Sequence, residues 1–460
     1  MIFSNIHIVY LIGIGGIGMT AIAQYFLLHN KKVAGYDCTP SDNTKMLETL
    51  GAEIHYDENT EFISNIVSKY KKDNILVIYT PAISQSSPLI TWFKEKNIPL
   101  YKRAEVLGKI CSQYQTIGVA GTHGKTTISS IIAHILFNSE YSCCAFLGGI
   151  IKNYNSNFLF NEYTKYAVVE ADEFDYSFLQ LSPIASVITS IDPDHLDIYK
   201  TYDKLKEAFQ QYVNQIKPQG KLLIKKPIAF VPSSNHLQIA TYSLNDKTAD
   251  CYITDIKLNN SYFTFNIHTP WGILENITPE ITGNYNIENV LAAVSITMWM
   301  GLNKETIKHA VESFKGIKRR FDVKVNNNKH IYIDDYAHHP EEIKALIQSV
   351  RTVFPNIPIT GIFQPHLYSR TRDLANEFAQ SLEMLDEICL LPIYPAREEP
   401  IKGVDSMLIF NKINSKNKYF ISDELLLNWV KIKKPKLLIT MGAGNIDHWV
   451  EPIKNILNEA

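Results

Sequence analysis

One stretch decides the fold: Thr116-Ile117-Gly118-Val119-Ala120-Gly121-Thr122-His123-Gly124-Lys125-Thr126-Thr127. Its first five residues predict a buried strand, and the apolar run 128–136 predicts a helix. Glycines between a strand and a helix let backbone N–H groups surround phosphates, while a lysine reaches the outer phosphates and a hydroxyl binds Mg²⁺. The loop is a shortened variant, because the usual first glycine would fall at Val119. We therefore predict a nucleotide-phosphate site formed by Gly121, Thr122, His123, Gly124, Lys125, Thr126 and Thr127.

Strand and helix patterns alternate on both sides of this stretch, which predicts an α/β fold with parallel sheets. A chain of 460 residues is too long for one ordinary core. We expect a Rossmann-like domain at 1–113, a phosphate-loop domain with a β-rich elaboration at 114–317, and a Rossmann-like domain at 318–460. Strands are predicted at 6–12, 32–36, 74–79, 116–120, 166–169, 185–190, 330–333, 359–363, 387–391 and 436–440, and helices at 20–29 and 286–299.

The composition is that of a globular protein, with 45% hydrophobic and 20% charged residues. The net charge of -2 gives no reason to expect a nucleic-acid or membrane surface, so local groups must hold any anionic ligand. Six cysteines without C-x-x-C spacing predict buried free thiols in a reducing compartment. We find no signal peptide and no membrane-spanning run, and we expect a cytoplasmic protein.

A second glycine-rich turn, Gly13-Ile14-Gly15-Gly16-Ile17-Gly18, lies between a predicted strand and a predicted helix. Gly13, Gly15, Gly16 and Gly18 would let backbone amides approach a pyrophosphate at the helix N-terminus. Asp37 ends the second predicted strand, where it could meet a ribose hydroxyl. NAD, FAD and UDP-sugars share this geometry, so the motif by itself indicates only a nucleotide diphosphate.

Two acidic clusters follow strands of the middle segment, at 170–175 and 192–197. The carboxyl ends of parallel strands meet at one edge of a sheet, so both clusters should lie beside the phosphate loop. Solvated acidic loops are the simpler reading for either cluster alone. Beside a phosphate loop we favour magnesium binding, since Mg²⁺ prefers carboxylate and phosphate oxygens.

The third segment contains the runs 334–340 and 364–373, which are rich in histidine and arginine. An arginine can hold both oxygens of a carboxylate or phosphate, so these runs predict an anion site. Paired His338 and His339 could instead bind a metal, which we rank lower because no third ligand stands at helical spacing. Surface arginines without a ligand remain the plain alternative.

Taken in this order, these motifs resemble the Mur ligase family, and the resemblance covers nearly the whole chain. The matching runs are Gly13 to Met19, Gly121 to Thr127, Glu170 to Glu173, Asp194-His195, Gly316 to Phe321, Asp334 to Pro340 and Gln364 to Asp373. The resemblance implies a first domain that binds a UDP-sugar, a middle domain that binds ATP and a third domain that binds an amino acid.

The resemblance also implies roles for single residues. ATP and Mg²⁺ would be held by Lys125 and by three metal ligands: Thr126, Glu170 and His195. Asn286 and Asn289 would lie near the adenine, and Arg320 would reach the phosphates. Tyr336, His366 and Arg370 would face the amino acid, and His338 would act there or on the sugar carboxylate. The catalytic group would then comprise Lys125, Glu170, His195, Arg320 and His338.

Two positions depart from the family pattern. Tyr285 stands where histidine is common, and Phe209-Gln210-Gln211 has no counterpart of the carbamylated lysine of some sister ligases. The run Gln364 to Asp373 is absent from the relative that recycles murein tripeptide, which favours L-alanine as acceptor.

We therefore expect an ATP-dependent ligase, monomeric or homodimeric, that joins L-alanine to the lactyl carboxylate of UDP-N-acetylmuramate in peptidoglycan synthesis. The alternatives are a ligase for another acceptor such as murein tripeptide, a nucleotide-sensing protein without catalysis, and a nucleotide-dependent oxidoreductase.

Overall fold

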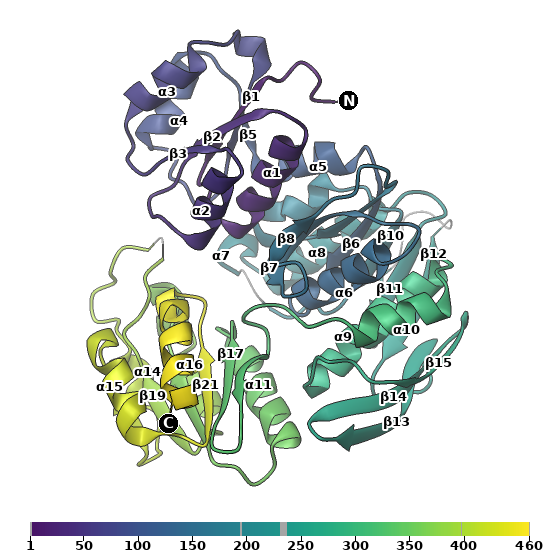
Figure 1. Cartoon of the computed structure of the whole chain (residues 1–460), viewed down its shortest axis with the longest axis vertical. Coiled ribbons are helices and arrows are strands. Elements are labelled where there is room, and N and C mark those ends of the chain that lie inside the picture. Colours follow the sequence, from purple (N-terminus) through teal and green to yellow (C-terminus); the bar gives the residue numbers. More distant parts are fainter. Residues whose placement is uncertain (1, 194–195, 231–236, 397, 460) are drawn as a thin grey trace. The chain divides into compact units, whose positions relative to one another are not determined.

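The computed structural model describes residues 2–193, 196–230, 237–396 and 398–459. These residues form three β-sheets with helices packed on them, and each sheet is drawn in Figure 1. By internal contacts the chain divides into two compact units. The first comprises 1–256, 265–278 and 288–314, and the second comprises 257–264, 279–287 and 315–460. The predicted α/β class is confirmed.

The first sheet has the order β3-β2-β1-β4-β5, and all its strands are parallel. The predicted helix at 20–29 begins earlier than expected, at Ile17, because Gly16 is extended and ends the glycine turn. The strands are β1 (Ile8–Ile12), β2 (Lys32–Tyr36), β3 (Glu53–His55), β4 (Ile75–Tyr79) and β5 (Leu100–Lys102). The helices are α1 (Ile17–Leu28), α2 (Asp42–Thr49), α3 (Thr60–Val67), α4 (Pro88–Glu95) and α5 (Arg103–Cys111), with a 3-10 turn η1 (Lys72–Asn74).

The second sheet has ten strands in the order β15-β14-β13-β12-β11-β10-β6-β9-β7-β8. The predicted β-rich elaboration of this domain forms the β11–β15 side, so it extends this sheet rather than forming one of its own. Strands β6, β9, β10, β11 and β12 run parallel to their neighbours within that group. The strands are β6 (Gln115–Ala120), β7 (Cys144–Ile151), β8 (Ser156–Leu159), β9 (Tyr166–Glu170), β10 (Ala185–Ile188), β11 (Lys221–Lys225), β12 (Gln238–Ser243), β13 (Cys251–Asn259), β14 (Tyr262–Thr269) and β15 (Gly272–Ile277). The helices are α6 (Lys125–Phe137), α7 (Leu196–Tyr199), α8 (Tyr202–Asn214), α9 (Asn284–Trp299) and α10 (Lys304–Glu312), with a 3-10 segment η2 (Phe174–Gln180).

The third sheet has the order β16-β17-β21-β18-β19-β20 and is parallel except for the edge pair β16–β17. Its strands are β16 (Asp322–Asn326), β17 (Ile331–Asp335), β18 (Ile359–Phe363), β19 (Glu387–Leu390), β20 (Lys418–Phe420) and β21 (Leu437–Met441). The helices of this region are α11 (Pro340–Val353), α12 (Tyr368–Asp373), α13 (Ala375–Leu382), α14 (Met407–Phe410), α15 (Asp423–Lys433) and α16 (Val450–Glu459), with a 3-10 turn η3 (Asn445–Trp449).

The first two sheets share one hydrophobic core through the helices α1 and α5. Val9 and Leu11 of β1, Phe26 of α1, and Phe146 and Phe158 of β7 and β8 belong to the same buried cluster. Helix α1 has buried side chains all round for most of its length, as expected of a helix packed on both sides. The glycine turn that precedes α1 is therefore fixed from both sheets.

A buried polar contact supports the same junction. Asn157 of β8, 2% exposed, accepts a hydrogen bond from the Gln24 side chain of α1 (3.3 Å) and donates one to the carbonyl of Ile17 (2.6 Å). Buried polar groups of this kind are costly to leave unpaired, so the contact also fixes the register of α1 against β8.

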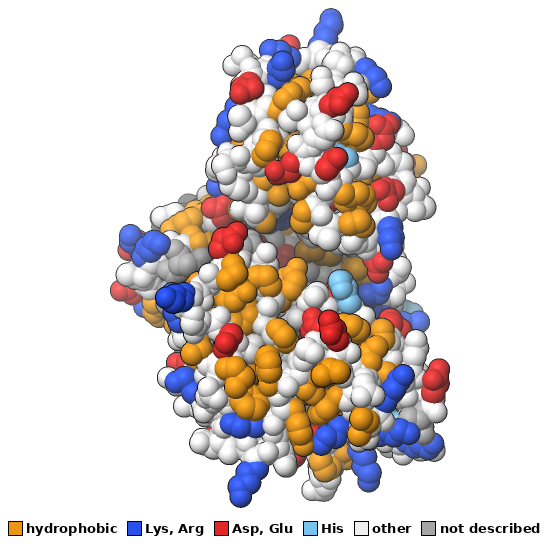
Figure 2. Space-filling model, turned by 90° about the vertical axis from the view of Figure 1, so that its left-hand side faces the viewer, with side chains coloured by type: hydrophobic (Ala, Val, Ile, Leu, Met, Phe, Trp, Pro, Cys, Tyr) orange, Lys and Arg blue, Asp and Glu red, His pale blue; other side chains and the backbone are white. Residues whose placement is uncertain are grey.

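On the face drawn in Figure 2, acidic and basic side chains are scattered, with hydrophobic side chains between them. None of the helices in the described ranges is long and apolar enough to cross a bilayer. All six cysteines are described; five are buried and Cys38 is exposed. Burial raises the pKa of the Cys251 thiol to about 12, so this thiol stays protonated near neutral pH.

Substitution of Asn157 tests the junction. Asn157→Leu should lower the free energy of unfolding by about 1–3 kcal/mol, because Gln24 and the Ile17 carbonyl lose their partner while buried. Urea denaturation would measure this, with Asn65→Ala, an exposed position on α3, expected to stay within about 0.5 kcal/mol of the parent. Equal stability of the two variants would show that the contact carries no weight.

Candidate functional site: a phosphate loop and a histidine–arginine cluster

The loop between β6 and α6 has the backbone that a phosphate loop requires. Gly121 (φ 131°) and Gly124 (φ 82°) both lie in the left-handed region, which favours glycine. A Cβ at Gly121 would stand 2.1 Å from the Thr189 hydroxyl oxygen, so no other residue fits without a shift. Gly124 immediately precedes α6, and the loop thus delivers Lys125 and Thr126 to the first turn of a helix.

The segment after β10 holds the loop from the side. Strand β10 ends at Ile188, earlier than predicted, and Ser190 is therefore free to turn towards the loop. The Ser190 hydroxyl accepts a hydrogen bond from the His123 backbone N–H (3.0 Å) and lies 2.8 Å from the Thr122 hydroxyl. Asp192 accepts from the same Thr122 hydroxyl (3.3 Å). These contacts fix a short loop that sequence alone indicates only by its glycines.

Lys125 points into the interior of the loop rather than into solvent. Its ammonium donates to the Gly121 carbonyl (2.7 Å) and to both carboxylate oxygens of Glu173 (2.9 and 2.8 Å). Burial disfavours the charged form, but Glu173, Asp172 and Glu170 outweigh it and raise the pKa of Lys125 above its usual range. The loop therefore keeps a positive charge at the position expected for the outer phosphates.

Two of the three predicted metal ligands, Thr126 and Glu170, lie within the described residues. Thr126 is buried in the first turn of α6, and Glu170 ends β9, where its carboxylate accepts the Gly148 N–H at 3.1 Å. The register pairs Glu170 with Val119, one residue before the end of β6. His195 lies outside the described residues. In the ranges that the structure covers, no three His, Cys, Asp or Glu side chains gather closely enough to hold a metal by themselves.

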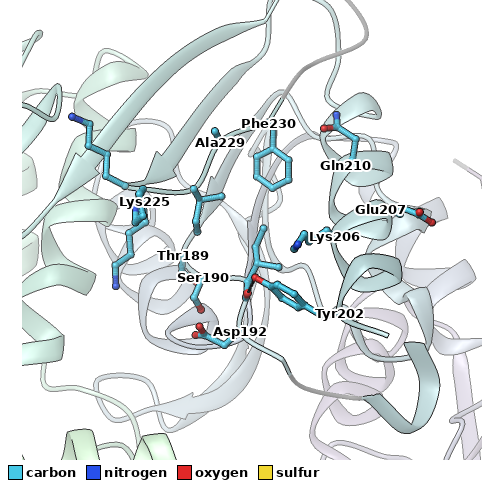
Figure 3. A pocket seen from close by; sticks show the side chains of 14 residues that line it. Thr189, Ser190, Asp192, Tyr202, Lys206, Glu207, Gln210, Lys225, Ala229 and Phe230 are labelled. Atoms are coloured by element: carbon cyan, nitrogen blue, oxygen red, sulfur yellow. Dashed lines mark hydrogen bonds between the residues drawn. The ribbon is translucent and has the colours of Figure 1, made fainter. Parts of the chain in front are cut away.

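A cavity of about 640 Å³ opens beside the loop (Figure 3). It shares Thr189, Ser190 and Asp192 with the contacts described above. Helix α8 contributes Tyr202 and Lys206 from the opposite side, and the residues that follow β11 close a further wall. The full lining comprises Thr189, Ser190, Ile191, Asp192, Tyr202, Lys206, Glu207, Gln210, Lys225, Lys226, Pro227, Ile228, Ala229 and Phe230.

The first glycine turn is also formed as predicted, and Asp37 supports it from within. Gly13 has a φ of 85°, and α1 begins without a side-chain cap or an acidic residue in its first turn. Asp37 accepts a hydrogen bond from the Gly15 N–H (2.8 Å). A Cβ at Gly15 would stand 2.9 Å from this carboxylate, so a larger residue at this position would displace the Asp37 side chain. Gly16 ends the turn immediately before α1, and Gly18 lies in the first turn of that helix.

The two asparagines proposed for adenine have different surroundings. Asn286 is 4% exposed and donates to the Thr282 carbonyl (2.7 Å). Asn289 lies against the phosphate loop, since a Cβ at Gly124 would be 2.8 Å from its side-chain oxygen. Tyr285, the departure from the family pattern, donates to Asp335 at 3.4 Å.

In the second unit the structure brings the predicted histidines and arginines together. The His338 ring lies 5.2 Å from the Tyr336 ring and 6.0 Å from the His366 ring, measured between centroids. The Arg320 guanidinium lies 5.2 Å from the centre of the Tyr336 ring. Burial lowers the pKa of His338; Glu342 opposes this, and Arg370 and Arg320 reinforce it. His338 is therefore neutral near pH 7 and stands among positive groups.

Arg370 comes from the short helix α12. Its Nη1 atom is buried without a hydrogen-bond partner among the described residues. Because a buried guanidinium nitrogen is costly to leave unpaired, this atom suits a ligand with an acceptor oxygen. The neighbouring Arg372 is exposed and pairs with Asp373 at 2.7 Å.

Sequence reasoning missed two residues of the site. Glu173 belongs to the acidic run at 170–175, but nothing in its spacing distinguishes it as the partner of Lys125. Asp335 accepts from the backbone N–H groups of Phe321 (2.6 Å) and Ala337 (2.8 Å), so it positions the segments that carry Arg320 and His338. The signal that could have indicated Asp335 was its place at the end of a predicted buried strand.

Comparison with family models places a Mur ligase model on each part of the chain. The Mur ligase family catalytic domain matches residues 8–115, the Mur ligase middle domain matches 119–297, and the Mur ligase glutamate ligase domain matches 319–444.

Similar proteins and structures span the full length. The UDP-N-acetylmuramate--L-alanine ligase of Parabacteroides distasonis is 45% identical over 99% of this chain and 98% of its own. The enzyme of the same name from Flavobacterium johnsoniae is 42% identical over the whole of both chains. Among solved structures, a UDP-N-acetylmuramate-alanine ligase from Thermotoga maritima has a TM-score of 0.81 at 23% identity, covering 98% of this chain and 99% of that one. A murein peptide ligase from Psychrobacter arcticus has a TM-score of 0.72 at 20% identity, covering 99% of both chains. With its phosphate loop, its glycine turn and its three α/β sheets, the chain belongs to the Mur ligase family.

Proposed function

We propose that this protein is the ATP-dependent ligase that joins L-alanine to the lactyl carboxylate of UDP-N-acetylmuramate and releases ADP and phosphate. The observation that carries the proposal is the full-length identity of 42–45% to relatives with that named activity. The buried Lys125 in a formed phosphate loop agrees with ATP as the co-substrate. Peptidoglycan precursor synthesis in the cytoplasm is the setting in which this reaction has a use.

We also propose that the three domains expected from the sequence, 1–113, 114–317 and 318–460, bind the UDP-sugar, ATP and the amino acid respectively. Gly13, Gly15, Gly16, Gly18 and Asp37 would bind the UDP-sugar. Asn286, Asn289 and Arg320 would contact ATP together with the phosphate loop. All the ligands in this proposal are small molecules.

The lactyl carboxylate must be activated, because an amine does not react with a carboxylate to form an amide at neutral pH. In the proposed sequence the lactyl carboxylate attacks the γ-phosphorus of ATP, the bond to the bridging oxygen of ADP breaks, and an acyl phosphate results. The neutral amine of L-alanine then attacks the acyl carbon, and phosphate leaves. Such reactions depend chiefly on positioning and on neutralising charge at the phosphoryl oxygens. Lys125 would supply one positive charge there, and the resemblance to the family assigns a second to Arg320.

Magnesium fits the residues present. Thr126 and Glu170 offer oxygen atoms, the ligand type that Mg²⁺ prefers, and such sites are usually completed by water and substrate phosphate. We propose these two residues with His195 as the magnesium ligands. When bound, Mg²⁺ would neutralise charge on the phosphate oxygens.

The amino-acid site is proposed at Tyr336, His366 and Arg370, with His338 beside them. The buried Nη1 of Arg370 would bind the carboxylate of L-alanine. His338 is neutral near pH 7, and it could accept the proton that the amine loses on forming the amide.

A second candidate function is ligation of murein tripeptide, since a murein peptide ligase shares the fold. One experiment separates the two: ADP release with UDP-N-acetylmuramate across a panel of single amino acids and the tripeptide. L-Alanine-dependent release supports our proposal. ADP release that depends on the tripeptide alone would favour the second function. Nucleotide binding without any ADP release would indicate a nucleotide-sensing protein without catalysis.

Removal of the phosphate-loop charge gives the first functional prediction. Lys125→Ala should lower kcat by about a hundredfold or more, because the outer phosphates lose their charged partner. Lys125→Arg keeps the charge next to Glu173 and serves as the folded control, with thermal unfolding measured for both. Near-normal turnover in folded Lys125→Ala would refute the loop assignment.

The proposed metal ligand is tested by titration. Glu170→Gln keeps the size of the side chain but removes its charge, so the Mg²⁺ concentration for half-maximal activity should rise about tenfold. The control is Glu61→Gln, an exposed acid on α3. Superimposable magnesium curves for the parent and Glu170→Gln would remove Glu170 from the site.

The acceptor site is tested at Arg370. Arg370→Lys should raise the KM for L-alanine roughly ten- to a hundredfold, because lysine presents a single point charge instead of a fork and a charged hydrogen bond is worth about 1.5–3 kcal/mol. Arg372→Lys, on the same helix but exposed, is the matched control. Steady-state kinetics should vary each of the three substrates in turn. A defect confined to ATP or to UDP-N-acetylmuramate would mean that Arg370 binds another ligand.

A further inference from the structure

The ammonium of Lys125 is already fully engaged in the structure described here. One hydrogen bond goes to the Gly121 carbonyl (2.7 Å), and two go to the oxygens of Glu173 (2.9 and 2.8 Å). The Lys125 side chain is 11% exposed and that of Glu173 is 0% exposed. A lysine ammonium has three N–H donors, so a phosphate can bind here only if an existing contact is weakened or lost.

Hydrogen bonds hold the backbone at Glu173 in place. Its own backbone carbonyl accepts a hydrogen bond from the buried Tyr199 hydroxyl. The preceding residue is fixed as well, since the Asp172 carbonyl accepts from Phe178 N–H (2.8 Å) and its side chain accepts from Phe174 N–H (3.2 Å). Because these hydrogen bonds hold the backbone that carries the Glu173 side chain, an arriving phosphate must compete with Glu173 for the Lys125 ammonium.

The carboxylates nearest Lys125 oppose an anion, although Arg103 lies 3.9 Å from one of them, Asp172. Three carboxylates, those of Glu173, Asp172 and Glu170, interact electrostatically with the single Lys125 ammonium. Each of them also repels a phosphate placed beside that ammonium, and repulsion is only partly screened at a buried site. The Lys125–Glu173 ion pair therefore opposes nucleotide binding in two ways, by occupying the cation and by adding a negative charge.

We propose that Glu173 is a positioning residue that acts through Lys125: it holds the ammonium inside the loop when the site is empty and competes with the nucleotide phosphates for it. Glu173 thereby weakens the binding of ADP and speeds its release after the reaction. This proposal rests on the nucleotide-binding role proposed above for Lys125. It assigns to the third acidic residue of the Glu170–Glu173 run a role distinct from metal binding.

The decisive measurement is the affinity for ADP in the full-length enzyme, by calorimetric titration with and without Mg²⁺. Glu173→Gln preserves the shape of the side chain and removes its charge. We expect ADP to bind about 10- to 100-fold more tightly, the effect of deleting one partly screened charge. In steady state, both kcat and the KM for ATP should fall, because product release slows. A residue with a merely structural role would weaken ADP binding when substituted, so tighter binding distinguishes the two.

Two further variants make the test independent of the folding of Glu173→Gln. Glu173→Asp keeps the charge but withdraws it by one methylene, and its ADP affinity should lie between those of the parent and Glu173→Gln. Asp175→Asn removes a charge from the same loop, but Asp175 pairs with Lys102 at 2.8 Å, so ADP affinity should stay unchanged. Unchanged or weaker ADP binding in either folded Glu173 variant would overturn the proposal.

The outcome also separates this proposal from the one on which it depends. If the parent enzyme binds no ADP, or if Lys125→Ala binds ADP as well as the parent does, the phosphate-loop assignment itself fails. If the parent binds ADP through Lys125 but Glu173→Gln binds it no more tightly, only the role of Glu173 is lost.

Discussion

Neighbouring parallel strands end at the same edge of a sheet, and three of them, β6, β9 and β10, end where the phosphate loop begins. Each delivers a different group: β6 leads into the glycine loop, β9 into the acidic run, and β10 into Ser190. Residues separated by almost 70 positions in the chain thus hold one another, as Ser190 holds His123. Without this common edge neither the lysine nor its carboxylate partner would be placed, because both follow directly from where their strands stop.

The parts of this arrangement that depend on local rules could be predicted from the sequence. The glycines, an apolar strand and a following helix predicted the loop at Gly121 to Thr127, and the structure has that loop, with Gly121 and Gly124 at positive φ. The α/β class followed from alternation in the same way. In contrast, the partner of Lys125 could not be predicted, because any carboxylate of the 170–175 run satisfied the pattern. Which one reaches the lysine depends on the backbone after β9, where Asp175 and Tyr176 take positive φ values.

The motif at 334–340 shows the same limit in the second unit. Its histidine and arginine neighbours gather as expected, but its two aspartates support the site from within. Asp335 binds backbone N–H groups on two segments, and burial raises the pKa of Asp334 to about 6, although Arg319 opposes the shift. The run 334–340 therefore contains two kinds of polar residue. Some are proposed to face a ligand, and others hold those residues in position. The spacing in the sequence does not distinguish the two kinds of residue, whereas their burial and hydrogen bonds in the structure do.

The distribution of the thiols has a practical side. Five of the six cysteines are enclosed, and the exposed one, Cys38, directly follows the aspartate that supports the first glycine turn. A maleimide or iodoacetamide reagent should thus modify the native enzyme at a single position, without prior mutagenesis. An environment-sensitive fluorophore attached there would sit next to the proposed pocket for the UDP-sugar, and its emission would follow occupancy of that pocket in real time.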